Sequence, residues 1–102
     1  MELPLISDCR LDLDGRRAQR DRYRRLGERI AGLERGALSF TVHFDEAADA
    51  ALLEQTVAVE RDCCPFFELV LDAEARHLTV SVEHPEQAPA LDALLFALGR
   101  GA

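Results

Sequence analysis

Alternating hydrophobic and polar positions predict three strands. Residues 37–44 (ALSFTVHF) alternate without a break, and one face carries only leucine, valine and phenylalanine. This pattern is typical of a half-buried strand. Residues 66–72 and 77–83 show the same alternation and are separated by a short polar loop. We therefore expect the second and third strands to form an antiparallel hairpin.

Hydrophobic residues three and four positions apart predict three helices. The first covers residues 16–35, is rich in arginine, and repeats apolar side chains from Tyr23 to Leu33. The second covers residues 46–63, with Asp45 as its expected N-cap, and Pro65 prevents it from continuing. The last helix covers residues 86–98.

Together these elements predict a single α+β domain spanning residues 1–102. An irregular segment, 1–15, precedes the helix of residues 16–35, and a β-α-β-β-α core fills residues 37–98. The first two strands are joined through a helix, so we expect them to lie parallel with a right-handed crossover. The result would be a small three-stranded mixed sheet with helices packed on one face. Its two open edges favour a homodimer.

Composition excludes several classes of protein. The chain is short, 48% hydrophobic and has a net charge of -7, and it has no apolar run long enough to span a membrane. No secretory signal is visible, so we expect a cytoplasmic location. The arginines concentrate in residues 10–35, but the chain as a whole is acidic, which argues against nucleic acid as a partner.

The most distinctive motif is the adjacent pair Cys63 and Cys64, which Pro65 follows directly. Thiolates are soft ligands and select Hg(II), Cu(I), As(III) or Zn(II) over hard cations. Cys9 is the expected third metal ligand, and Glu60 and His43 are secondary candidates. Because 54 residues separate Cys9 from the pair, only the fold decides whether it approaches.

Two alternatives stay open for the cysteines. Buried cysteines often act only as small hydrophobic side chains, as in a homodimeric structural or interaction domain. A Cys-dependent redox or transfer enzyme is the second alternative. We assign no catalytic residue, because no histidine base is evident beside the cysteines and no CxxC motif occurs.

The run from Val59 to Phe67, with its double cysteine, resembles a small bacterial domain that occurs alone or fused to MerR-like heavy-metal-responsive regulators. The similarity extends to the segment around Cys9 and to the closing helix. The resemblance implies a role in sensing, buffering or resistance to a soft metal or metalloid, with Cys9, Cys63 and Cys64 as ligands. The DNA-reading part of those regulators has no counterpart in this sequence, so regulation through DNA is not implied.

Overall fold

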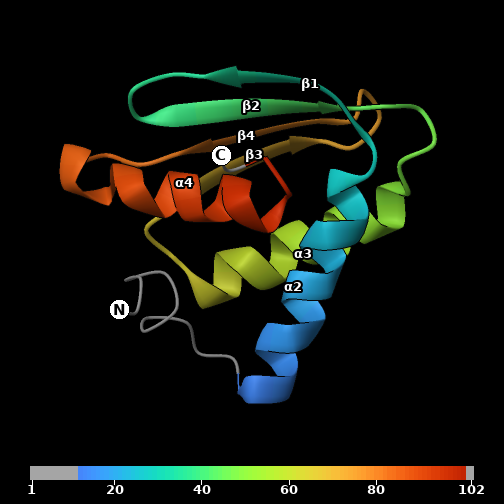
Figure 1. Ribbon diagram of the computed structural model, residues 1–102, viewed down its shortest axis with the longest axis horizontal. Coiled ribbons are helices and arrows are strands. Elements are labelled where there is room, and N and C mark those ends of the chain that lie inside the picture. Colours follow the sequence, from blue (N-terminus) through green and yellow to red (C-terminus); the bar gives the residue numbers. More distant parts are fainter. Residues whose placement is uncertain (1–11, 101–102) are drawn as a thin grey trace.

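The computed structural model describes residues 12–100, which form a four-stranded antiparallel sheet covered on one face by helices (Figure 1). The strand order is β1-β2-β4-β3. The elements in chain order are α2 (Leu13–Gly27), β1 (Ile30–Arg35), β2 (Ser39–Phe44), α3 (Ala50–Cys63), β3 (Glu68–Asp72), β4 (His77–Ser81), a short 3-10 turn (Pro85–Gln87) and α4 (Ala88–Ala97). The expected irregular segment, 1–15, lies mostly outside the described residues, and α2 already begins within it.

The predicted α+β class and the placement of the helices on one face are confirmed, but the sheet differs from the prediction. It has four strands instead of three, and every neighbouring pair is antiparallel. Strand β4 lies between β2 and β3, with Phe40 opposite Val80, so the expected direct parallel pair does not form. The hairpin of β3 and β4 places its second strand, and not its first, beside β2.

The fourth strand comes from a segment that was predicted to be helical. Helix α2 ends at Gly27, and residues 30–35 turn back as β1 to pair with β2. Gly36, expected as a helix stop, instead lies in the hairpin turn, where its N–H donates to Ser39 O at 2.7 Å. The spacing of Ile30 and Leu33 suits a helix equally well, which explains the wrong prediction.

Helix α3 begins four residues later than expected and ends where expected. Asp49, and not Asp45, is its N-cap: the carboxylate accepts from the N–H groups of Ala51 and Leu52 at 2.9 and 3.3 Å. The helix ends at Cys63, because Pro65 cannot continue it. The chain then turns directly into β3, and this corner holds both cysteines.

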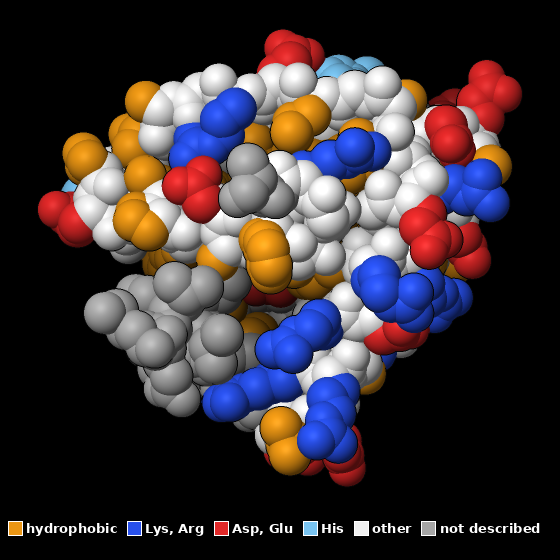
Figure 2. All heavy atoms as spheres, viewed as in Figure 1, with side chains coloured by type: hydrophobic (Ala, Val, Ile, Leu, Met, Phe, Trp, Pro, Cys, Tyr) orange, Lys and Arg blue, Asp and Glu red, His pale blue; other side chains and the backbone are white. Residues whose placement is uncertain are grey.

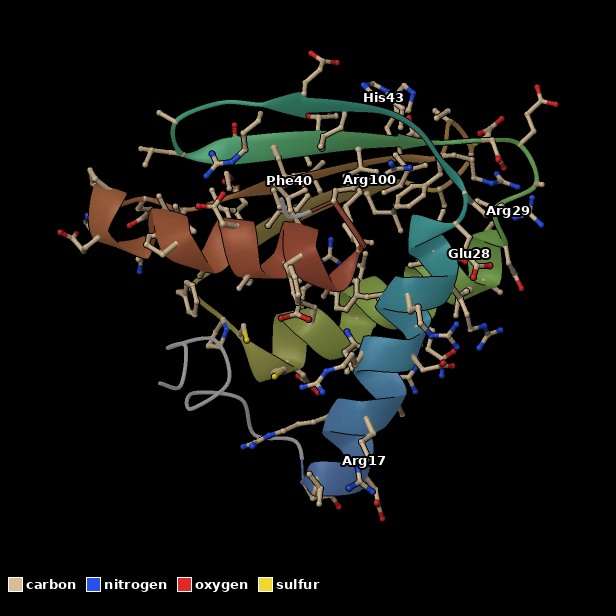
Figure 3. The ribbon with its side chains drawn as sticks, in the orientation of Figure 1. Arg17, Glu28, Arg29, Phe40, His43 and Arg100 are labelled. Carbon is tan, nitrogen blue, oxygen red and sulfur yellow. The ribbon has the colours of Figure 1, made fainter. Side chains whose placement is uncertain are left out.

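The core lies between the sheet and the helices. Phe40 lies between the sheet and α4 in Figure 3, and Val42, Leu78 and Val80 are buried on the same face. The opposite face of the sheet is polar, with the hydroxyls of Thr41 and Thr79 3.0 Å apart. Of the helices described, none has the length and apolar character that crossing a membrane requires.

Candidate metal centre

A carboxylate and two sulfurs meet where α3 ends. The ligand atoms of Glu60, Cys63 and Cys64 all lie within 4.8 Å of one another. All three side chains are buried, with exposed fractions of 4%, 3% and 0%. Such a group could hold a metal ion, since thiolate and carboxylate are both ligands of Zn(II) and thiolates bind softer ions.

The local backbone explains why these three side chains converge. Glu60 and Cys63 are three residues apart and share one face of α3, and Cys64 follows as the C-cap residue with a non-helical backbone. The N–H of Cys64 donates to Glu60 O at 2.8 Å, which closes the last turn of α3. The two Sγ atoms lie 3.6 Å apart. One ion can therefore contact both sulfurs at metal–sulfur distances of about 2.3 Å.

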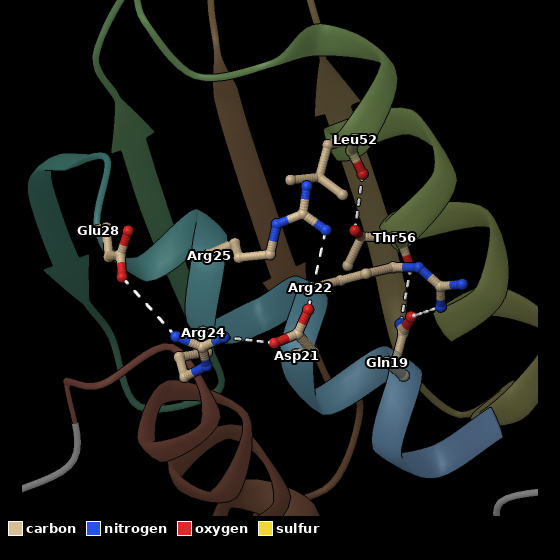
Figure 4. Close-up of polar contacts among 8 residues, drawn as sticks. All are labelled: Gln19, Asp21, Arg22, Arg24, Arg25, Glu28, Leu52 and Thr56. Carbon is tan, nitrogen blue, oxygen red and sulfur yellow. Dashed lines mark hydrogen bonds and ion pairs between the residues drawn. The ribbon is translucent and has the colours of Figure 1, made fainter. Parts of the chain in front are cut away.

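Helix α2 supplies the groups that hold the carboxylate. The phenol of Tyr23 donates to Glu60 Oε1 at 2.6 Å, and Gln19 Nε2 donates to the same oxygen at 3.2 Å. Gln19 Nε2 also lies 2.9 Å from Thr56 O, while Arg22 donates to Gln19 Oε1 at 2.8 Å (Figure 4). These bonds stabilise a buried carboxyl group that would otherwise be costly to remove from water.

The buried phenol has a perturbed acidity. Burial raises the pKa of Tyr23 well above its usual value, and the negative charge of Glu60 together with its hydrogen bond raises that pKa further. Tyr23 therefore remains a hydrogen-bond donor at any physiological pH. It fixes one oxygen of Glu60 and leaves the orientation of the carboxyl group defined.

The oxidation state of Cys63 bears directly on metal binding. Cys63 is disulfide-bonded. Its partner is not Cys64, because 3.6 Å is far longer than a disulfide bond of about 2.05 Å. Cys64 is a buried thiol. Both sulfurs can therefore act as thiolate ligands only after the disulfide of Cys63 is reduced.

The charges around the sulfurs differ from those expected next to a reactive thiolate. The C-terminal end of α3 carries the negative end of the helix dipole, which disfavours an isolated thiolate. Arg61 does not offset this effect directly, since its guanidinium donates to Leu69 O at 2.7 Å. A bound cation would compensate the negative helix end, whereas a free nucleophilic thiolate would not.

The cluster lies against a cavity of about 860 Å³ between α2 and α4. Figure 2 shows its mouth as a hollow, with arginine side chains of α2 along one side. The wall formed by α4 and its C-cap residue is apolar and comprises Ala93, Leu94, Phe96, Ala97 and Leu98. Arg16, Arg20, Arg24 and Arg100 also line the cavity. The lining of the cavity therefore combines the sulfur and carboxyl groups of the cluster with the positive charges of the arginines.

The remaining ligand candidates are placed differently. His43 lies on the face of the sheet opposite the helices (Figure 3). Its Nε2 is 2.8 Å from Glu34 Oε2, and its ring packs edge-on against His77. It is therefore not part of the cluster around Glu60. Cys9 lies outside the described residues, so its predicted role stays a prediction.

Two contributors to the site were not identified from the sequence. Gln19 is buried although it lies on an arginine-rich helix, and Tyr23 is four residues further along, on the same face. A polar side chain at helical spacing from a predicted buried tyrosine was the available signal. The cavity itself depends on how α2 and α4 are arranged, which no local pattern encodes.

The fold and the site define a small α+β domain with a buried Glu-Cys-Cys cluster beside a cavity that has one apolar wall. Comparisons with protein-family models, with curated proteins and with solved structures give no match for this chain.

Proposed function

We propose that this protein binds a soft metal or metalloid ion through the thiolates of Cys63 and Cys64, for sensing, buffering or resistance. Hg(II), As(III), Cu(I) and Zn(II) are the candidate ions. The observation that carries the proposal is the convergence of two sulfurs and the Glu60 carboxyl group within 4.8 Å. This donor set, buried and rigidly held, suits thiophilic ions. The proposed relationship to the double-cysteine domain of MerR-like regulators agrees with it.

The site requires a reducing compartment. Thiols stay reduced in the cytoplasm, where glutathione and thioredoxin systems act, and this is the location we propose. Reduction of the disulfide at Cys63 makes a second sulfur available beside Cys64. Metal occupancy would then depend on the redox state of the protein as well as on metal concentration.

The test is a titration of the reduced protein with Hg(II) and with arsenite, after removal of the reductant. Binding is followed by the ultraviolet charge-transfer absorbance of metal–thiolate bonds. Tyr23 is the only tyrosine in a chain without tryptophan, so its fluorescence gives a second signal from beside the cluster. We expect stoichiometric binding that is lost in the Cys63→Ser, Cys64→Ser double variant.

Matched variants separate ligation from folding. Glu60→Gln should weaken binding, whereas Glu54→Gln, on the exposed side of the same helix, should leave it unchanged. Circular dichroism verifies that each variant is folded. Binding of equal affinity in the folded double-serine variant would refute the proposal, as would a reduced wild-type protein that takes up neither ion.

A second candidate function is a structural or interaction domain whose cysteines only pack. The complete burial of Cys64 favours it, since the side chain belongs to the hydrophobic core. The homodimer expected from the open sheet edges belongs to this reading and is also compatible with metal binding. The same titration discriminates the two, because a packing role predicts destabilised serine variants of a protein that binds no metal.

A further inference from the structure

We propose that the cavity beside the cluster takes a trivalent arsenical that carries an aryl group, with arsenic on Cys63 and Cys64 and the aryl ring against α4. This inference rests on the proposed function and names its substrate class. The argument uses the size of the cavity, the chemistry of its walls and the geometry of the sulfurs.

The cavity is much larger than a bare ion requires. An ion held by two sulfurs and a carboxyl group needs only the space between them, but the adjoining volume is about 860 Å³. Pockets of about 300–1,000 Å³ are typical of sites for organic molecules. A cavity of about 150 Å³ already accommodates benzene. The volume therefore suits a metalloid with an organic substituent.

The wall opposite α2 is suited to an aromatic ring. Helix α4 presents Ala93, Leu94 and Ala97 to the cavity, and small alanine side chains leave room beside its backbone. Phe96 lines the same wall and is 71% exposed. A phenyl group bound there would cover this aromatic side chain and remove apolar surface from water.

The sulfurs provide the covalent attachment. An arylarsonous acid, R–As(OH)₂, has one As–C bond and two As–O bonds. A thiol reductant such as glutathione first reduces the disulfide of Cys63 and is itself oxidised. Reaction of the arylarsonous acid with the two free thiols then breaks both As–O bonds and both S–H bonds, forms two As–S bonds and releases two molecules of water, which carry the thiol protons. No electrons are transferred in this second step, so arsenic remains trivalent. The 3.6 Å separation of the Cys63 and Cys64 sulfurs allows both bonds to one arsenic atom.

The charge of the lining is compatible with this class of ligand. Arginines at positions 16, 20, 24 and 100 line the cavity. Arg24 is paired with Asp21 and Glu28, which reduces but does not remove the local positive charge. An arylarsonous acid is neutral, so these arginines do not oppose its entry. A carboxylate on the ring would gain from the same arginines.

The experiment compares phenylarsine oxide, which hydrates to the arylarsonous acid, with arsenite. Both are titrated into reduced protein and into dithiothreitol, a dithiol without a cavity. The quantity compared is the affinity for phenylarsine oxide divided by the affinity for arsenite. We expect this ratio to be about tenfold to hundredfold larger for the protein than for dithiothreitol, because the protein buries the ring.

Ala93→Trp should fill the cavity and abolish this excess preference for the phenyl compound, while arsenite binding persists. Ala88→Trp, at the other end of α4 and not in the cavity lining, is the matched control.

Each outcome is decisive. An excess preference that Ala93→Trp removes and Ala88→Trp retains supports the inference. A preference equal to that of dithiothreitol, or one unaffected by Ala93→Trp in a folded protein, overturns it and leaves the proposed metal-binding function standing. If reduced wild-type protein binds neither arsenical, both this inference and As(III) binding fail, and the Hg(II) titration then decides the broader proposal.

Discussion

The phenol of Tyr23 donates a 2.6 Å hydrogen bond to the carboxyl group of Glu60, which joins α2 to the end of α3. Both side chains are buried. The bond therefore links the packing of two helices to the position of a candidate metal ligand. Changes to either residue should be detected in stability, in tyrosine acidity and in metal affinity.

The first prediction concerns pH. The folded state raises the pKa of Tyr23 above its unfolded value of about 10, chiefly through burial and then through Glu60. The contribution of Tyr23 to stability is therefore complete below about pH 10 and is lost as the pH rises above that value. Denaturant unfolding across this range should show the decline.

Spectroscopic titration of the single tyrosine tests the cause. Glu60→Gln removes the neighbouring charge, so tyrosinate absorbance should appear at lower pH than in the wild type. Glu54→Gln should leave the titration unchanged. Identical curves for wild type and Glu60→Gln would contradict the electrostatic role given to Glu60.

A second prediction concerns Tyr23→Phe. The substitution keeps the ring but removes the donor, so of the hydrogen bonds within residues 12–100 Glu60 Oε1 keeps the longer one, from Gln19. We expect a loss of about 1–3 kcal/mol in the free energy of unfolding, because a buried acceptor loses a partner. Chemical denaturation measures it. A change as small as that of an exposed substitution, about 0.5 kcal/mol, would show that the bond contributes little.

The sequence allowed prediction of those elements whose signals are local. Unbroken alternation located β2 and β4, and Pro65 located the end of α3. The helix expected over residues 16–35 was wrong beyond Gly27, where the chain turns back and residues 30–35 pair with β2. The same turn brings Gly27 so close to Leu98 that an added Cβ atom would overlap the backbone carbonyl oxygen of Leu98, which is 71 positions away in sequence. The periodicity of hydrophobic residues along the chain does not predict a contact between residues so far apart in sequence.

In the candidate site, too, local sequence patterns predict some features, whereas others depend on how the helices pack. Glu60 and Cys63 share a face of α3, and Cys64 follows directly as its C-cap residue, so their proximity in sequence brings the three side chains close together. The hydrogen bonds from Gln19 and Tyr23 depend on how α2 packs against α3. The placement of His43 on the far face of the sheet was implicit in the strand alternation, since its neighbours Val42 and Phe44 are buried.

The third prediction is a homodimer. Edge strands β1 and β3 carry Leu33 and Val70, which are 38% and 58% exposed. Pairing between edges would cover such side chains and satisfy open backbone groups. Sedimentation at micromolar concentration should give twice the chain mass. A mass near 11.3 kDa would reject the dimer.

The fourth prediction concerns Cys9, which lies outside the described residues. If it is a third ligand, Cys9→Ser should weaken metal binding strongly and leave the circular dichroism of the metal-free, reduced protein unchanged. A trigonal thiolate site would lose one of three bonds. Hg(II) affinity measured against a competing thiol provides the test, and an affinity equal to that of wild type would remove Cys9 from the site.

The last prediction tests the close contact of α2 and α4. In Gly27→Ala the new methyl group would overlap the backbone carbonyl of Leu98, so the two helices must move apart. Gly27 is the last residue of α2, and the gain in helix propensity is small there. We expect a net loss of about 1–3 kcal/mol in the free energy of unfolding.

Gly32→Ala is the control, since its Cβ would meet only the His43 side chain at 3.7 Å. Because Gly27 also lines the cavity, Gly27→Ala should lower affinity for phenylarsine oxide more than for arsenite. Equal stability of the two alanine variants would contradict the close helix contact.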